Sequence, residues 1–325
     1  MMKKEKTNLL PTGTPLRQQP NGGIMVVQKA GRFVPKIVLY AVMLGLSFVF
    51  LYPFLYMLVT SLKTSADLNN VLVAWIPRSL ELGNYRMAIQ LMNYWKTMGN
   101  SAIVTVLGTL GQLISCAMAG YSLARFDFFG KRLASMFVIL AMLIPTTTII
   151  VPQYLLYGNF GWFNTFYPLV IPCFFGFGVK GALFIYIFRQ FFLGQPRELE
   201  EAAKVDGCGF IRVFTHIVCP VAKSVFVVVL VLALVWHWSD YFEPSMYLNK
   251  ADIQLVSMRV QSITEVLKMA AEALESSQGI SEETPITNAT LMAGTFIVVL
   301  PILAVYAMLQ KQFIQGIERS GLTGE

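Results

Sequence analysis

The chain has 325 residues, of which 55% are hydrophobic and only 13% are charged, and its net charge is +7. Soluble domains typically carry about 25% charged residues, so this chain has too little polar surface to cover its apolar residues in water. The composition therefore excludes a soluble enzyme, a disordered chain and a secreted disulfide scaffold, and it indicates an integral membrane protein.

The positive charge does not indicate nucleic-acid binding, because the basic residues flank long apolar runs and are not interleaved with stacking aromatic side chains. The four cysteines, Cys116, Cys173, Cys208 and Cys219, have no paired spacing, and the chain has only two histidines. We therefore expect no disulfide framework, no metal site and no cofactor.

Six apolar runs can cross a bilayer as helices, which takes about 20 residues. They cover residues 37–62, 101–123, 134–156, 166–188, 225–241 and 291–309. The first run lies too far from the N-terminus, and lacks a small-residue cleavage site, to be a signal peptide. The sequence thus predicts an all-α membrane domain with six transmembrane helices over residues 37–325, preceded by a cytoplasmic tail over residues 1–36.

Lysine and arginine set the expected orientation, because they accumulate on the cytoplasmic side. With six spans, both termini lie on one side, and that side carries 17 of the 25 Lys and Arg residues. The opposite side carries Lys63, Arg78, Arg86, Lys96, Lys250, Arg259 and Lys268, and Lys180 falls inside the fourth run. We therefore expect a multi-pass protein of the cell membrane with both termini cytoplasmic.

The cytoplasmic connection over residues 195–224 is much longer than two neighbouring spans need. Pro196 can open a helix with three glutamates in its first turns, and Gly207 and Gly209 interrupt it before a second short helix that ends near Pro220. This shape fits docking into a groove of a soluble partner, and it equally fits an interfacial helix lying on the lipid headgroups.

Part of this connection resembles the EAA signature of permease subunits in ATP-binding-cassette (ABC) importers. The matching positions are Glu201, Ala202, Ala203, Gly207, Ile217 and Pro220. The leucine that usually precedes the proline is Cys219 here. Other stretches, including residues 119–125 and residues 310–313, are similar to the maltose-type carbohydrate permeases. The resemblance extends from about Pro35 over nearly the whole chain, with a type-1 transmembrane core at about residues 99–310.

The resemblance implies the type I importer fold, with residues 195–224 as the segment that couples the permease to an ATPase. Glu201 would contact the ATPase subunit, and Gly207 would allow the turn. The implied partners are a second permease, two ATPase subunits and an extracytoplasmic solute-binding protein. The chain itself is not expected to be an enzyme, because Gly130-Lys131, its nearest approach to a P-loop, is followed by Arg132 and lacks the first glycine.

Six residues in or beside the membrane are candidates for the translocation pathway. They are Lys180, Tyr186, Trp236, Trp238, Asp240 and Tyr241. A charge inside a span costs at least ~2.5–3.5 kcal/mol, so Lys180 either faces the pathway or reaches a polar group where nearby glycines break the helix. Aromatic rings beside hydrogen-bonding groups suit a sugar, but they also fit the aromatic belt of any membrane interface.

The leading hypothesis is a permease subunit of a carbohydrate importer. An importer of a non-sugar solute shares the EAA signature, so the carbohydrate assignment depends on the flanking similarities. An ion-coupled secondary carrier is a further alternative, but it would hold ionisable residues inside its spans, where this chain has almost no Asp or Glu. A membrane enzyme would need a catalytic constellation, and no plausible one is present in the sequence.

The external segment over residues 240–286 is long and acidic. Val256, Val260, Ile263 and Val266 recur at helical spacing and predict an amphipathic helix. In the maltose-type family a loop in this position probes the ligand cleft of the binding protein, and the resemblance implies this role for residues 276–281. A solvated connector is the alternative.

Overall fold

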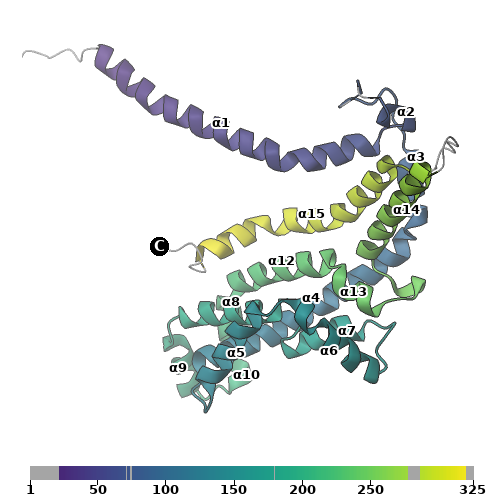
Figure 1. Ribbon diagram of the computed structural model, residues 1–325. Helices are drawn as coiled ribbons and strands as arrows, with labels where there is room; N and C mark the ends of the chain where they lie inside the picture. The colour runs from purple at the N-terminus through teal and green to yellow at the C-terminus, as the bar shows by residue number, and fades with distance from the viewer. Residues whose placement is uncertain (1–21, 71, 74, 179, 277–285, 320–325) are drawn as a thin grey trace, which may run out of the picture. The chain divides into compact units, whose positions relative to one another are not determined.

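The computed structural model describes residues 22–70, 72–73, 75–178, 180–276 and 286–319. Every regular element within these ranges is a helix (Figure 1). A membrane-spanning chain favours helices because they satisfy their backbone hydrogen bonds internally. Residues 1–21 of the expected tail, and residues 277–281 of the expected loop, lie outside the described residues.

The chain divides into two units, residues 1–55 and residues 56–325. The described part of the first unit belongs to helix α1 (Gly22–Ser61), which continues into the second unit. The side chains from Pro35 to Leu55 are all exposed, and most of them are apolar. Such a surface indicates that lipid or another membrane helix covers it in the functional protein.

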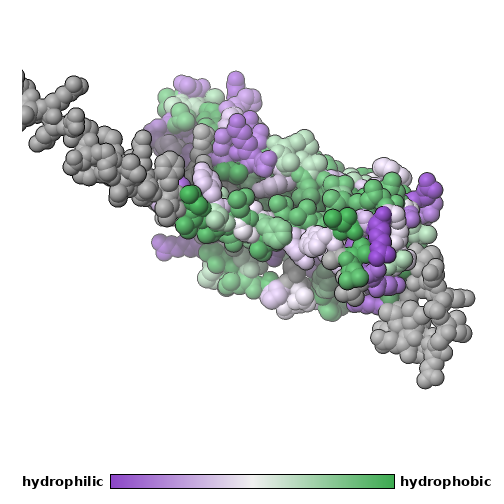
Figure 2. Space-filling view, turned by 90° about the horizontal axis from the view of Figure 1, so that it is seen from above, coloured by the Kyte–Doolittle hydropathy of each residue, from purple (hydrophilic) through white to green (hydrophobic). Residues whose placement is uncertain are grey.

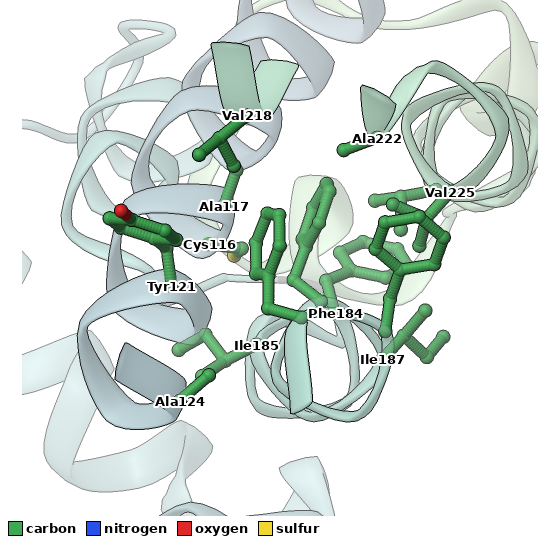
Figure 3. Close-up of a cluster of buried hydrophobic side chains, with 14 of the residues drawn as sticks. Cys116, Ala117, Tyr121, Ala124, Phe184, Ile185, Ile187, Val218, Ala222 and Val225 are labelled. Carbon is green, nitrogen blue, oxygen red and sulfur yellow. The ribbon is translucent and has the colours of Figure 1, made fainter. Parts of the chain in front are cut away.

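Four helices form the centre of the second unit. They are α4 (Tyr94–Arg125), α8 (Gly181–Leu193), α12 (Lys223–Ser239) and α15 (Asn288–Arg319). Helix α4 packs against α8 and α12, and α12 packs against α15. Cys116 and Ala117 of α4 and Phe184 of α8 are fully buried in this core (Figure 3). Small residues allow the close approach: a Cβ on Gly120 would lie 2.7 Å from the Cβ of Phe188.

Two of the expected spans are broken in the structure. Residues 134–156 fall on α5 (Lys131–Leu143) and α6 (Thr146–Asn159), which are separated at Pro145. Residues 166–188 fall on α7 (Tyr167–Val170), the 3₁₀-helix η1 (Ile171–Phe175) and the first part of α8. Gly176 and Gly178 have φ values of 71° and 100°, a left-handed backbone that glycine adopts readily and that ends η1 before α8 begins.

Three of the described helices are long and apolar enough to cross a membrane: Pro35–Ser61, Tyr94–Arg125 and Asn288–Gly316. The number rises to five if each of two bent helix pairs forms one span. These pairs are Lys131–Leu143 with Thr147–Asn159, and Phe210–Val221 with Lys223–Ser239. Helix α8 has only 13 residues, which is short for a bilayer. The six-span topology therefore stays a prediction.

Within the described residues, the segments expected outside the membrane on one side contain five helices. They are α2 (Ser65–Leu68), α3 (Gly83–Leu91), α13 (Phe242–Tyr247), η3 (Ala251–Ile253) and α14 (Val256–Ser276). The helix expected from the apolar spacing after Val256 is therefore present. Val256 and Ile263 are buried with Ala88, Met92 and Ala293, so the apolar face of α14 packs against the core.

The connection between α8 and α12 also folds into short helices. They are α9 (Glu198–Val205), α10 (Phe210–Val213), the π-helical turn η2 (Phe214–Val218) and α11 (Cys219–Val221). Figure 1 shows α9 and α10 near α5 and α8, at one end of the second unit. Apolar side chains, green in Figure 2, cover much of the visible surface, as expected for a protein that contacts lipid or other membrane subunits.

Candidate coupling site

The EAA segment forms a helix, a glycine turn and a second helix. Helix α9 begins two residues after Pro196 and is followed by Gly207, whose φ of 80° is left-handed. The backbone N–H of Gly207 donates to the carbonyl of Lys204 at 3.0 Å, and the N–H of Cys208 donates to the carbonyl of Ala203 at 2.9 Å. These bonds close the end of α9 and direct the chain into α10.

Helix α9 has an inner and an outer face. Glu200 and Ala203 are three residues apart and buried, whereas Glu201 and Val205 are four residues apart and exposed, Val205 to 88%. Residues three or four apart share one side of a helix. The two adjacent glutamates therefore lie in different environments, and the glutamate of the EAA motif is the one on the outer face.

Glu200 ties α9 to the end of α4. The hydroxyl of Tyr121 donates to Oε2 of Glu200 at 2.7 Å, and Nε of Arg125 lies 2.8 Å from Oε1. Nη2 of Arg125 also donates to the carbonyl of Gln195 at 3.0 Å. The side chains of Arg125 and Glu200 are only 5% and 8% exposed. A buried charge is tolerated when it is paired and hydrogen-bonded, and this arrangement meets both conditions.

Aromatic rings surround Tyr121, which contacts this ion pair through Glu200. The ring centroids of Phe192 and Phe214 lie 5.4 Å and 5.2 Å from that of Tyr121, and those of Phe126 and Phe210 lie 5.9 Å and 5.8 Å away. Aromatic pairs at these separations attract one another. The low local dielectric also strengthens the attraction between the buried charges.

The outer surface of the coupling segment is partly apolar. Leu199, Val205 and Ile211 are all more than half exposed near the exposed Glu201. Exposed apolar side chains with a charged neighbour are typical of a surface that docks another protein.

The remaining EAA positions fall on both faces. Ala202 is exposed and Ala203 is buried. Ile217 packs against the core cluster of α4, α8 and α12, while Pro220 is exposed in α11. Cys219 is half-buried. The signature therefore combines positions that fix the segment to the membrane domain with positions that face outward.

Two of the six pathway candidates lie together. Nζ of Lys180 is 5.9 Å from the ring centroid of Trp236, which is within the range of a cation–π interaction. Lys180 directly precedes α8 and has a φ of 58°, so it sits at a helix break and not in the middle of a helix. The ring of Trp236 also lies 5.5 Å from that of Phe184. The pair thus joins the start of α8 to α12.

The other four candidates are not part of this cation–π pair. Trp238 donates its indole N–H to the carbonyl of Val298 at 3.0 Å, which links α12 to α15. Asp240 follows α12, and Tyr241 lines a polar pocket of ≈ 180 Å³. Tyr186 is half-buried in α8.

Asp240 and Glu243 are two half-buried carboxyl groups beyond the end of α12. Burial, with a smaller effect from the neighbouring Asp240, raises the pKa of Glu243 to about 7. Burial also raises the pKa of Asp240 to about 6. Both shifts have the same cause, because removing a carboxylate from water disfavours its charged form.

The network of Glu200, Tyr121 and Arg125 was not predicted from the sequence. A signal was present, because Tyr121 and Arg125 are four residues apart and so share one face of α4, where a hydroxyl and a guanidinium can hold one carboxylate. A buried polar pair was not predicted either: Nε2 of His237 lies 3.1 Å from Oε1 of Gln112. Within the described residues, no three His, Cys, Asp or Glu side chains are placed to hold a metal ion.

Known proteins resemble this chain in both sequence and structure. Residues 111–319 match the sequence profile of the family described as binding-protein-dependent transport system inner membrane component. The chain is 31% identical to protein LplC of Bacillus subtilis (strain 168), over 84% of this chain and 89% of the relative. It is 26% identical to the lactose transport system permease protein LacG of Rhizobium radiobacter, over 88% of this chain and 96% of the relative.

A solved structure has the same fold. It is a bacterial ABC transporter involved in the import of the acidic polysaccharide alginate, with a TM-score of 0.68, 23% identity, and coverage of 85% of this chain and 95% of that chain. The all-α fold of an ABC importer transmembrane domain is thereby confirmed.

The helices and the matching relatives define a class of protein, the membrane-embedded permease subunit of an ABC importer. The chain belongs to the family of binding-protein-dependent transport system inner membrane components. The resemblance predicted from the EAA positions is confirmed, and the protein is a multi-pass inner membrane protein.

Proposed function

We propose that this chain is a permease subunit of an ATP-driven carbohydrate importer. It would form the translocation pathway with a second, different permease and work with two ATPase subunits and an extracytoplasmic solute-binding protein. The named substrates of the similar proteins, lactose for LacG and alginate for the solved transporter, support the carbohydrate class. ATP hydrolysis belongs to the ATPase subunits in this proposal, and the present chain supplies the pathway.

The division of α9 into two faces carries the coupling part of the proposal. Glu201 and Val205 are exposed and available to a partner, while Glu200 is held by Tyr121 and Arg125 of α4. A partner that moves the outer face therefore also moves the end of a membrane helix. This is the geometry that a coupling segment needs, because the two faces of one short helix contact different moving parts.

A charge reversal on the outer face tests this assignment. Glu201→Lys should weaken co-purification of the ATPase subunits and reduce uptake by at least tenfold, while membrane insertion and the yield of the permease stay unchanged. Glu265→Lys is the control, because it reverses an exposed charge on α14, outside the coupling segment. Normal co-purification and uptake in the Glu201 variant would contradict the coupling role.

The proposal also requires that α9 and both termini lie in the cytoplasm. The support is the charge distribution of the sequence, in which 17 of the 25 Lys and Arg residues fall on that side. A reporter inserted at Asp127 or Asp206 should read cytoplasmic, and one inserted at Lys250 should read external. An external signal at Asp206 would refute the orientation and the coupling assignment together, because no cytoplasmic ATPase could reach α9.

The carbohydrate assignment has a separate test. The solute-binding protein encoded beside this permease should bind an oligosaccharide in calorimetry, and it should not bind peptides, polyamines or phosphate. If one of those solutes binds in place of the sugar, the substrate class is wrong, whereas the coupling assignment is unaffected.

A further inference from the structure

A basic pocket lies where the loop after α4, the first turns of α5 and the helix α8 come together. It encloses ≈ 530 Å³ and is lined by residues of the loop and of α5, and by Arg189 from α8. Helix α4 ends at Arg125 and α5 begins at Lys131, and both helices belong to apolar segments able to cross the bilayer. The pocket therefore lies at a membrane surface.

The lining of the pocket is positively charged. Lys131, Arg132 and Arg189 line the pocket together with a single carboxylate, that of Asp127. Asp127 pairs with Lys131 at 3.1 Å, so this pair leaves the charges of Arg132 and Arg189 uncompensated within the lining. Two arginines in one pocket lining favour an anion, and the planar guanidinium matches the oxygens of a phosphate group.

Arg189 gives a second, independent indication of a ligand. Its Nε is buried and has no hydrogen-bond partner among the described residues. A buried donor without an acceptor is unfavourable, and none of the salt bridges among the described residues involves Arg189. An anion in the pocket that Arg189 lines would offset the charge of its guanidinium.

The rest of the pocket is apolar. Met136, Ile139 and Leu140 line it from α5, and all three are more than a third exposed. Their spacing of three and four residues places them on one face of the helix. On the neighbouring loop, Phe129 is fully exposed, as expected for an aromatic side chain that enters the lipid interface. A free phosphate ion would not need this apolar wall, but an acyl chain would.

We propose that this pocket binds one anionic phospholipid, with its phosphate at Arg189 and Arg132 and an acyl chain along Met136, Ile139 and Leu140. Basic pockets between transmembrane helices bind anionic lipid headgroups of this kind. The site lies on α8, which leads directly into the coupling segment. A bound lipid would therefore connect α5 to α8 near α9. The residues that tie α9 to α4, which are Tyr121, Arg125 and Glu200, do not line this pocket.

Native mass spectrometry of the purified full-length protein, with phosphatidylglycerol or phosphatidylcholine added to the detergent, tests the proposal. The wild type should retain phosphatidylglycerol in preference to phosphatidylcholine. Arg189→Gln and Arg132→Gln should each weaken the binding of phosphatidylglycerol about fivefold, since one basic residue near an anionic lipid contributes about that factor. Lys223→Gln should leave it unchanged, because Lys223 is an exposed cation at another helix start, outside this pocket.

Three results would overturn the proposal. The first is equal retention of both lipids, and the second is unchanged retention of phosphatidylglycerol in Arg189→Gln and Arg132→Gln. Arg132 is exposed, so its replacement leaves the fold intact and keeps this outcome interpretable. The third is loss of the lipid when millimolar inorganic phosphate is added or when the second permease binds, because these results would identify a free-anion site or a subunit interface.

Discussion

The buried ion pair between Arg125 and Glu200 supports the sharpest prediction about the coupling segment. Glu200→Gln keeps the size of the side chain but removes the charge that Arg125 faces at 2.8 Å. Arg125 then remains as a buried cation without a carboxylate partner. It keeps its hydrogen bond to the carbonyl of Gln195, and the hydroxyl of Tyr121, which contacts Glu200, lies on the same face of α4. We expect the end of α9 to detach from α4, while the membrane helices stay folded.

The size of the effect follows from burial. Breaking a buried pair by removing one partner costs about 3–5 kcal/mol, and both side chains here are less than a tenth exposed. For a domain of this size, 1 kcal/mol corresponds to roughly 2–4 °C in unfolding temperature, so Glu200→Gln should lower it by about 10 °C. Tyr121→Phe removes one hydrogen bond to a charged group, worth about 1.5–3 kcal/mol, and should have a smaller effect.

The assay is a double-mutant cycle measured on the assembled transporter. Unfolding temperature, basal ATPase activity and substrate uptake are compared for Glu200→Met, Arg125→Met and their combination, which form the cycle, and for Glu200→Gln and the control Glu198→Gln. The combined variant should recover much of the stability, because apolar residues of similar volume replace a buried ion pair at little cost. Uptake should stay low in all variants except the control, since the charged tie between α9 and α4 is absent.

Two results would refute this reasoning. One is a Glu200→Gln variant with the unfolding temperature and uptake of Glu198→Gln, which would show that Arg125 and Glu200 do not interact in the working protein. The other is a combined variant with normal uptake. In that case the ion pair contributes stability, and the movement of α9 reaches the membrane by another route.

Three further predictions test the backbone, a buried acid and the helix packing. Gly207→Ala should reduce uptake severalfold. The space around Gly207 is open, but its φ of 80° costs an L-residue about 1–2 kcal/mol. The control Gly209→Ala, at a φ of −68°, should transport normally. Burial raises the pKa of Glu243 to about 7 in the folded protein, so the folded state binds more protons than the unfolded state between pH 4.5 and about 7. The unfolding temperature should therefore fall as pH rises through this window. Glu243→Gln should make this fall smaller, and the remaining fall comes from Asp240, whose pKa is also raised. Gly120→Ala should destabilise the protein by about 1–3 kcal/mol in thermal unfolding, because its Cβ would overlap Phe188, whereas Gly99→Ala on the same helix meets open space and should be neutral.

Periodicity predicted the elements whose polar and apolar residues alternate. The spacing of Val256 and Ile263 gave helix α14, and the proline, the glutamates and Gly207 gave helix α9 and its turn. In α14 one face of the helix is apolar and the other is polar, so the sequence pattern reports the helix directly, whereas α9 was predicted from residues that start and end helices.

The breaks in the third and fourth expected spans could not be predicted in the same way. In the third span the residues are apolar on both sides of the break, so composition does not change where the helix ends. In the fourth span the glycines beside Lys180 did suggest a break, and Gly176 and Gly178 have a left-handed backbone there. Proline did not help either, because Pro152 and Pro301 lie inside α6 and α15, whereas Pro145 separates α5 from α6. Whether a proline bends or ends a helix depends on the neighbours that satisfy the freed carbonyl groups, and these neighbours come from distant parts of the chain.

The two glutamates of α9 show the same limit at the candidate site. A motif identifies Glu201 because the residues of the motif lie at fixed spacings within one short segment. Glu200 interacts instead with Tyr121, which is 79 residues away in the sequence. Binding of a partner at Glu201 alone would move only a surface helix. In the proposed coupling, the movement would reach α4 because the neighbouring carboxylate is buried and paired with Arg125, and a buried pair is costly to separate. The proposal therefore needs docking on one face and anchoring on the other, and only the docking face has a local sequence signature.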